Sequence, residues 1–235
     1  MDAPRLFTAL VVVSPLLAGH AQAQELPASM APPPPRPDTA RSDGTPRSAG
    51  ATALPADETA CRQALTALGA AFAEADPVID KAQGCAAPHP VTVSRLSPGV
   101  ELRPPALLNC AMAAASARYV RDHAAPLALR EFDSPLAAVE QASSYVCRPR
   151  HGTAKLSEHA FANALDWSAL ILEDGTRIEI RAYDASDEPR RARFLSALRA
   201  SACGPFATVL GPGSDPDHSD HFHFDMARRR NPFCQ

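Results

Sequence analysis

Residues 165–183 read LDWSALILEDGTRIEIRAY, in which two apolar runs flank the dipeptide Asp174-Gly175. Asp-Gly between two such runs is a strong signal for a tight turn, so this stretch predicts two antiparallel strands joined as a hairpin. Residues 187–204 follow with apolar residues at helical spacing. Asp187 suits the N-cap of this helix and Gly204 can end it.

The sequence before the hairpin predicts two further helices. Residues 61–76 carry apolar side chains at intervals of three and four, and this helix is expected to stop before Pro77. A second helix is expected to begin at Pro104-Pro105 and to reach Tyr119, because proline is well tolerated in the first helical turn.

Short apolar segments predict the remaining strands. They are residues 91–96, 138–146, 208–210 and 221–225. Together with the hairpin, these elements predict an α+β fold in which helices pack on a small, mainly antiparallel sheet.

The first 60 residues differ in composition from the rest of the chain. Residues 1–23 join an apolar run to the small residues of Ala21-Gln22-Ala23, the pattern of a cleaved signal peptide. The alternative is a buried N-terminal helix, which Pro4 and Pro15 disfavour. Residues 24–60 are rich in proline and poor in large apolar side chains, so we expect a flexible tether rather than a ligand for a proline-binding domain. The apolar run is too short for a membrane span, so the mature protein is expected to be periplasmic or secreted.

The net charge bears on which classes of partner the protein has, and the cysteine content bears on the compartment in which it folds. The formal net charge is -3, which favours neither nucleic acid nor an anionic membrane surface as a partner. Six cysteines in an exported chain indicate disulfide bonds, with free buried thiols as the alternative. We expect sequential pairing, as Cys61–Cys85, Cys110–Cys147 and Cys203–Cys234.

Histidines gather near the C-terminus, where residues 218–225 read HSDHFHFD. If the end of this stretch is a strand, the alternation of its side chains places His221, His223 and Asp225 on one face. The two phenylalanines then lie on the other face and can hold the strand to the core. This arrangement suits a metal site in which one imidazole is a ligand and another lies beside it.

Residues 156–168, LSEHAFANALDWS, supply two further candidate ligands. His159 and Asp166 are seven residues apart, which would place both on one face of a helix. Alternatively, His159 caps a short helix and Asp166 opens the following strand, which fits the apolar run after it better. A buried carboxylate needs a cation or several donors to offset its desolvation. With His223, the two residues form a candidate set for one zinc ion, and manganese or another divalent ion would also suit it.

These segments resemble known families. SEHAFANALD, residues 157–166, is similar to the SxHxxGxAxD motif of the LAS-type zinc peptidases, with Ala162 in place of the glycine. HSDHFHFD is similar to the HxxHxH ending of the murein endopeptidase branch of that group. The stretch from Cys61 to Cys234 resembles the bacterial extensin-like C-terminal domain in the segments LNCAMA, SSYVCRPR, LSEHAFANALD, FATVLGP and DHFHFD. The resemblance implies a LAS-type fold over residues 61–235.

The resemblance also implies roles for the polar residues. The implied zinc ligands are His159, Asp166 and His223. His221 would be the catalytic base, acting on a water molecule that the zinc ion activates while it polarises an amide carbonyl. His218 would help to stabilise the tetrahedral intermediate, with a solvated loop residue as the alternative. Asp220 and Asp225 are candidates for orienting the imidazoles.

SSYVCRPR, residues 143–150, is the remaining candidate segment. The related peptidases have a Ser-x-Tyr-Arg segment whose arginine binds a substrate carboxylate. In this sequence Val146-Cys147 separate the tyrosine from the first arginine, so either arginine fits the role, with a surface ion pair as the alternative. The candidate substrate-binding residues are Ser144, Tyr145, Arg148 and Arg150, with His151 as a further contact.

The preferred hypothesis is a zinc metallopeptidase that cleaves amide bonds of peptidoglycan, as a D,D-endopeptidase or a carboxypeptidase. The alternative from another class is a non-catalytic wall-binding or structural module with the same fold. Metal storage is a third hypothesis and would need more ligands. His221 beside a complete ligand set favours the enzyme, because a binding module needs no base. The sequence carries no prediction of oligomeric state.

Overall fold

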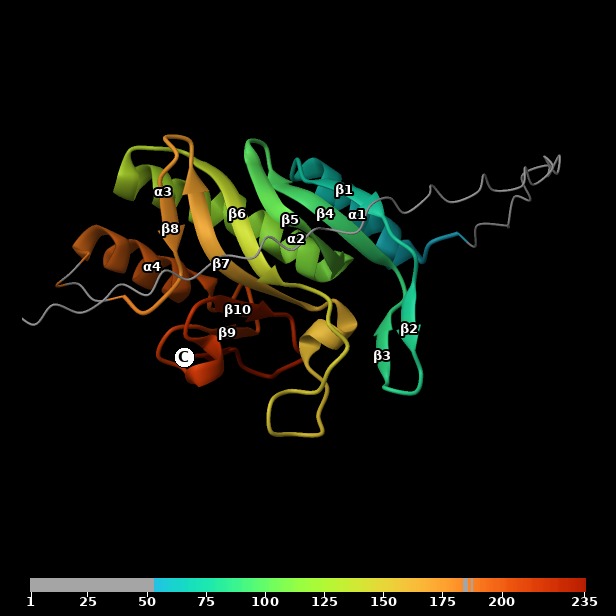
Figure 1. Cartoon of the computed structure of the whole chain (residues 1–235). Coiled ribbons are helices and arrows are strands. Elements are labelled where there is room, and N and C mark those ends of the chain that lie inside the picture. Colours follow the sequence, from blue (N-terminus) through green and yellow to red (C-terminus); the bar gives the residue numbers. More distant parts are fainter. Residues whose placement is uncertain (1–52, 184–185, 187) are drawn as a thin grey trace, which may run out of the picture. The chain divides into compact units, whose positions relative to one another are not determined.

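The computed structural model describes residues 53–183, 186 and 188–235 (Figure 1). The predicted signal peptide, residues 1–23, lies outside these residues, as do most of the predicted tether, residues 24–60, and the predicted N-cap Asp187. Within the described part of the chain, no helix is both long and apolar enough to cross a bilayer.

A single large sheet organises the described residues (Figure 1). Its nine strands there are β1 (Ala71–Glu74), β4 (Pro90–Ser97), β5 (Val100–Asn109), β6 (Leu136–Ser143), β7 (Ala164–Leu172), β8 (Arg177–Glu179), β9 (Thr208–Leu210), β10 (Phe222–Asp225) and β11 (Phe233–Cys234). The order is β1-β4-β5-β6-β7-β10-β9-β11, and β8 pairs with β7. All neighbouring pairs are antiparallel except β5 with β6 and β9 with β11. The mainly antiparallel sheet is confirmed, but it is larger than predicted and contains parallel pairs.

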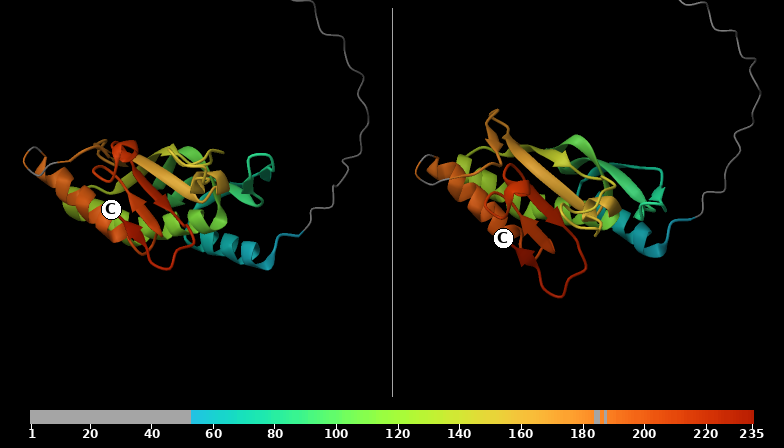
Figure 2. Two further views of the ribbon diagram at one scale, coloured as in Figure 1. Left: turned by 90° about the horizontal axis from the view of Figure 1, so that it is seen from below. Right: turned by 60° about the horizontal axis from the view of Figure 1, so that its bottom comes forward.

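Helices cover one face of this sheet, as Figure 2 shows. Helix α1 (Ala56–Ala67) packs on α2 (Cys110–Tyr119). A π-helical turn, Val120–Ala124, continues α2 into α3 (Ala125–Phe132), which packs on α4 (Pro189–Ala202). The predicted α+β class is therefore confirmed.

Four buried aromatic side chains hold the helices to strands β7 and β10. Phe206 and Phe224 stack with ring centroids 4.7 Å apart, and Trp167 meets Phe224 edge-on at 5.2 Å. Tyr119 of α2 meets Phe206 edge-on at 5.3 Å. Aromatic side chains bury roughly 150–250 Å² each and dominate core energetics. Because Trp167 belongs to β7 and Phe224 to β10, these contacts fix the two strands that carry Asp166 and His223.

The first helix begins and ends earlier than predicted. The helix expected over residues 61–76 is observed as Ala56–Ala67, and Phe72 lies in β1. Gly69 ends the helix with a φ of 75°, a conformation that glycine adopts without strain. A Cβ atom at Gly69 would lie 2.6 Å from the ring of Pro98, so space also requires glycine there.

Pro104 and Pro105 lie in a strand and do not begin a helix. Strand β5 includes both prolines, and α2 starts only at Cys110, where the Asn109 side chain caps it. The pairing of β5 with β4 is interrupted between Glu101 and Ala106. The prolines therefore occupy an irregular part of the ladder, where the missing N–H group removes no cross-strand bond.

The other predicted elements are confirmed with shifted ends. Residues 91–96 lie in β4, the hairpin of 165–183 is β7 and β8, and the helix of 187–204 is α4. The strand expected over 138–146 is β6, which ends at Ser143, and the two C-terminal strands are β9 and β10.

Three disulfide bonds join the six cysteines, which is consistent with export. They are Cys61–Cys110, Cys85–Cys147 and Cys203–Cys234. Only the last pair was predicted, and the expected pairs Cys61–Cys85 and Cys110–Cys147 are wrong. Pairing follows packing: α1 lies on α2, while a separate hairpin of β2 (Val78–Asp80) and β3 (Cys85–Ala87) approaches the chain that follows β6.

Candidate metal centre

The centre of the site is a cross-strand pair between β7 and β10. The two strands are antiparallel, and Asp166 lies directly opposite His223. Residues opposite each other in such a pair have Cβ atoms roughly 4.5–5.5 Å apart, so their side chains meet. The alternation predicted for residues 221–225 is confirmed, because Phe222 and Phe224 are buried in the core while His223 and Asp225 face the site.

A short helix before β7 brings in the third residue. His159 belongs to a 3-10 helix, Glu158–Phe161, which Ser157 caps by accepting a hydrogen bond from the His159 N–H group. Asp166 lies in the following strand. Of the two arrangements considered for these residues, the short helix followed by a strand is therefore confirmed, although Ser157 and not His159 caps the helix, and the single helical face is wrong.

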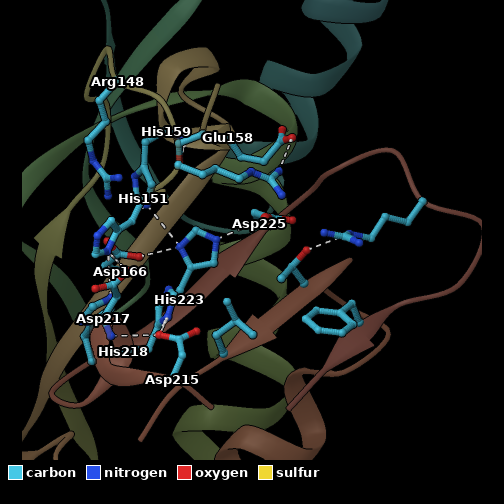
Figure 3. Close-up of a pocket in the computed structure, with 17 residues that line it drawn as sticks. Arg148, His151, Glu158, His159, Asp166, Asp215, Asp217, His218, His223 and Asp225 are labelled. Atoms are coloured by element: carbon cyan, nitrogen blue, oxygen red, sulfur yellow. Dashed lines mark hydrogen bonds and ion pairs between the residues drawn. The ribbon is translucent and has the colours of Figure 1, made fainter. Parts of the chain in front are cut away.

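The three side chains converge on one small volume (Figure 3). His159 Nε2 lies 3.2 Å from Asp166 Oδ2 and 3.2 Å from His223 Nδ1. His223 Nδ1 lies 2.8 Å from Asp166 Oδ1. All three residues are buried, and this His-Asp-His group could hold a metal ion.

The other ring nitrogen of each histidine is already engaged. His159 Nδ1 contacts the backbone carbonyl oxygen of Ser144, to which it can donate. His223 Nε2 lies 3.2 Å from Asp225 Oδ2. Partners of this kind fix the tautomer and orientation of metal-binding histidines. The donor set thus fits a divalent cation, since the two nitrogens left over are those that face Asp166.

The carboxylate and the imidazoles shift each other's protonation. Burial alone would raise the pKa of Asp166, but hydrogen bonds with His159 and His223 hold that pKa well below its usual value. Burial alone would lower the pKa of His223, whereas its hydrogen bonds to Asp166 and Asp225 raise it to about 9. Asp166 is therefore ionised at neutral pH, and His223 has to release a proton before it can bind a metal ion.

Two more histidines border the ligand cluster. His221 Nδ1 lies 2.9 Å from Asp220 Oδ1, and its Nε2 lies 3.9 Å from Asp166 Oδ2. His218 Nδ1 lies 2.6 Å from Asp215 Oδ1, and its ring centroid is 5.2 Å from that of His221. Each imidazole has its Nδ1 beside a carboxylate, so that Nε2 is the nitrogen left for other contacts.

A cavity of about 550 Å³ opens onto this cluster. Its walls come from the chain after β6, from the 3-10 helix that carries His159, and from β9 to β11 (Figure 3). The lining residues outside the cluster are Arg148, Arg150, His151, Ser157, Glu158, Thr208, Leu210, Asp215, Asp217, His218, His221, Asp225, Arg229 and Phe233.

Of the four predicted substrate-binding residues, only the two arginines line this cavity. Arg148 and Arg150 both line it, and Arg150 Nη2 lies 3.5 Å from Glu158 Oε1. Ser144 contributes its backbone carbonyl to His159, and Tyr145 is half-buried and not among the lining residues. His151 Nδ1 contacts Asp217 Oδ2 at 2.7 Å.

With this geometry in view, the sequence matches the family described as extensin-like protein C-terminus over residues 59–235. The chain belongs to this family. No curated protein and no solved structure matches it. The match confirms the predicted extensin-like domain, whereas the resemblance to zinc peptidases stays a prediction.

One departure from the resembled motif has a conformational cost in this extensin-like domain. Ala162 stands where the SxHxxGxAxD motif has glycine, and it has a φ of 51°. This left-handed conformation costs an alanine on the order of 1–2 kcal/mol. Ala162 ends the helix that carries His159, so the turn that places His159 is retained without the glycine.

Several lining residues of the extensin-like domain escaped the sequence analysis. Thr208 and Leu210 lie in the segment FATVLGP, for which no site role was predicted, and Arg229 and Phe233 carry no motif. Only the pairing of β9 with β10 and β11 brings these residues to the site. Asp215 is different, because it lies three residues before His218 in a short 3-10 helical segment. That spacing could have suggested the contact.

Proposed function

We propose that this extensin-like domain is a zinc-dependent hydrolase of the periplasm or cell exterior that cleaves peptide amide bonds of peptidoglycan, as a D,D-endopeptidase or a carboxypeptidase. The observation that carries the proposal is the convergence of His159 Nε2, His223 Nδ1 and the Asp166 carboxylate beside an open cavity. Structural zinc sites are usually closed by four protein ligands, whereas catalytic sites have three and leave a position for water.

His159, Asp166 and His223 would hold the zinc ion. When bound by three such ligands, zinc lowers the pKa of a water molecule to about 7 and polarises a substrate carbonyl. Asp166 lends the site its negative charge, and Asp225 and the Ser144 carbonyl keep the two imidazoles in the orientation that binding requires.

In this proposal His221 would move the proton. Its contact with Asp220 favours the tautomer with hydrogen on Nδ1, which leaves Nε2 free beside Asp166. From there it would accept a proton from the attacking water and return it to the leaving amine nitrogen. In its doubly protonated form, with Nδ1–H held by Asp215, His218 would donate a hydrogen bond from Nε2 to the oxygen on which negative charge develops.

Arg148 is the better of the two arginines for a substrate carboxylate. Both line the cavity, but Arg150 faces Glu158, while the Arg148 guanidinium donates only to the backbone oxygen of Pro149 among the described residues. A guanidinium without an acidic partner is free to bind a carboxylate through two parallel hydrogen bonds.

The test compares the exported full-length protein with a His221→Ala variant. Metal analysis is expected to find one zinc ion per chain in both proteins. New peptides released from peptidoglycan, separated by chromatography, are expected with the unaltered protein and at least about 100-fold less with the variant. Bound zinc without product from either protein would refute the enzyme and leave a non-catalytic wall-binding module. Absence of zinc and of every other divalent metal from both would refute the metal site.

A further inference from the structure

All the carboxylates that line the cavity have a basic partner, whereas two of its arginines have no acidic partner within the described residues. Each lining carboxylate has an imidazole or guanidinium partner within 3.5 Å. The pairs are Glu158 with Arg150, Asp166 and Asp225 with His223, Asp215 with His218, and Asp217 with His151. Of the three lining arginines, Arg148 and Arg229 have no carboxylate partner within the described residues. The cavity therefore offers two cations to an incoming ligand.

Arg229 is held on a defined wall of the cavity. Its Nε donates to Thr208 Oγ1 at 3.1 Å, and its guanidinium carbon lies 5.4 Å from the ring centroid of Phe233. Thr208 is buried in β9, and Phe233 begins β11, which pairs with β9. The Cys203–Cys234 disulfide fixes the residue next to Phe233. These contacts leave the two terminal nitrogens of Arg229 available to a ligand.

The two unpaired arginines lie on different sides of the metal ligands. Arg148 follows β6, whereas Arg229 contacts β9, and the sheet order places β7 and β10 between those strands. Beside Arg229 the wall carries Leu210 and Phe233, and Phe233 is 42% exposed although it is a large aromatic residue. An exposed ring stacked on a guanidinium offers both an apolar contact and a cation to one ligand.

From this geometry we propose that Arg229 and Phe233 form an anion-binding subsite, which binds a carboxylate of the peptide substrate. The inference rests on the proposed function for the peptide nature of the ligand, and it adds the requirement that the peptide carries a free carboxylate on the side of the scissile bond nearest β9. Arg229 is a substrate-binding residue in this proposal and takes no part in the chemistry.

The proposal is tested by binding and not by turnover. The probes are soluble muropeptides from a muramidase digest and the same muropeptides after their carboxylates have been converted to carboxamides with carbodiimide and ammonia. Affinities are measured by calorimetry with the zinc-loaded full-length chain carrying His221→Ala. We expect native muropeptides to bind at least about tenfold more tightly than amidated ones, because charge-assisted hydrogen bonds are lost on amidation.

Two neighbouring substitutions isolate the subsite. Arg229→Gln is expected to reduce that preference about tenfold, and Arg229→Lys is expected to fall between, since lysine retains the charge without the planar fork. Arg228→Gln makes the same charge change one residue away, outside the cavity lining, and is expected to retain the preference. Equal effects of Arg228→Gln and Arg229→Gln would refute the subsite, as would equal binding, or no binding, of the two probes.

The two proposals fail in different ways. Hydrolysis by the unaltered protein without any carboxylate preference would remove the subsite and keep the enzyme. A preference that depends on Arg229, without hydrolysis, would keep the subsite and support a wall-binding module. A thermal melt of Arg229→Gln like that of Arg228→Gln would show that weaker binding is not caused by unfolding, since Arg229 is exposed and its side chain donates one hydrogen bond, to Thr208, within the described part of the chain.

Discussion

At the scale of single residues, the site depends on which nitrogen of each histidine is engaged. Because Ser144 and Asp225 hold the outer nitrogens, the inner nitrogens and the Asp166 carboxylate face one another without any rearrangement of the fold. Asp166 is the only acid among the three candidate ligands, and it contacts both histidines. Its removal should therefore affect metal binding more than the loss of any neighbouring carboxylate.

Asp166→Ala is expected to abolish zinc binding at micromolar protein. Loss of an outer partner of a metal ligand typically costs about 10- to 100-fold in affinity, so loss of a charged ligand should cost at least about 100-fold. The measurement is zinc content after dialysis, with Asp220→Ala as the matched control because Asp220 contacts only His221 in the cluster. Full zinc occupancy in Asp166→Ala would remove Asp166 from the ligand set.

The three candidate ligands could be predicted from sequence, but the cavity wall that carries Arg229 could not. His223 and Asp166 are each next to an aromatic residue of the core, so the alternation of a strand sends them to the opposite face. Arg229 has no such pattern. It lies in a run of three arginines, and only the pairing of β9 with β11 distinguishes it from its neighbours.

At the scale of elements, local patterns predicted the strands better than the helix boundaries. Residues 91–96 and 208–210 are short and apolar, and both are strands. The helix boundaries failed where one residue outweighed the pattern. Gly69 stopped a helix whose apolar spacing continued, and Pro104 suited a first helical turn and also an interrupted strand. Cysteine pairing failed because it depends on which elements pack together.

The disulfides Cys61–Cys110 and Cys85–Cys147, which were not predicted from sequence, are expected to affect the protein differently when each is replaced by serines. Loss of Cys61–Cys110, which spans 49 residues, should lower the free energy of unfolding by about 4 kcal/mol on the loop-entropy estimate and leave zinc affinity unchanged. Loss of Cys85–Cys147 should in addition weaken muropeptide binding, because Arg148 follows Cys147 directly. Urea unfolding and calorimetry measure the two effects. Equal muropeptide affinity in both variants would contradict a role of the second disulfide in the cavity.

At the scale of the whole molecule, the buried His-Asp-His group links stability to pH and to metal. In metal-free protein His223 has a folded pKa raised to about 9, above its unfolded value of about 6.5. Its contribution is therefore fully present below about pH 6.5 and is lost as the pH rises through about 9. The lowered pKa of Asp166 acts in another window, since its contribution is lost only in acid.

Chelator-treated protein is expected to lose up to about 3 kcal/mol of unfolding free energy between pH 6.5 and 9 through His223. Zinc affinity should instead rise over the same pH range, because binding releases the His223 proton and is favoured at higher pH. Urea unfolding at a series of pH values tests both forms. A chelated His223→Gln variant with the same pH slope as the unaltered chain would show that another group causes it.

The covalent links also decide how the protein should be made. Cys147 precedes Arg148 and Cys234 follows Phe233, so two of the crosslinks end beside cavity residues while the aromatic core lies elsewhere. Overproduction in a reducing cytosol would remove all three crosslinks, and with them stabilisation comparable to that of a whole domain, so the chain is expected not to hold its fold there. An inactive preparation of that kind would say little about the proposed function, and recovery of muropeptide binding after air oxidation would identify the cause.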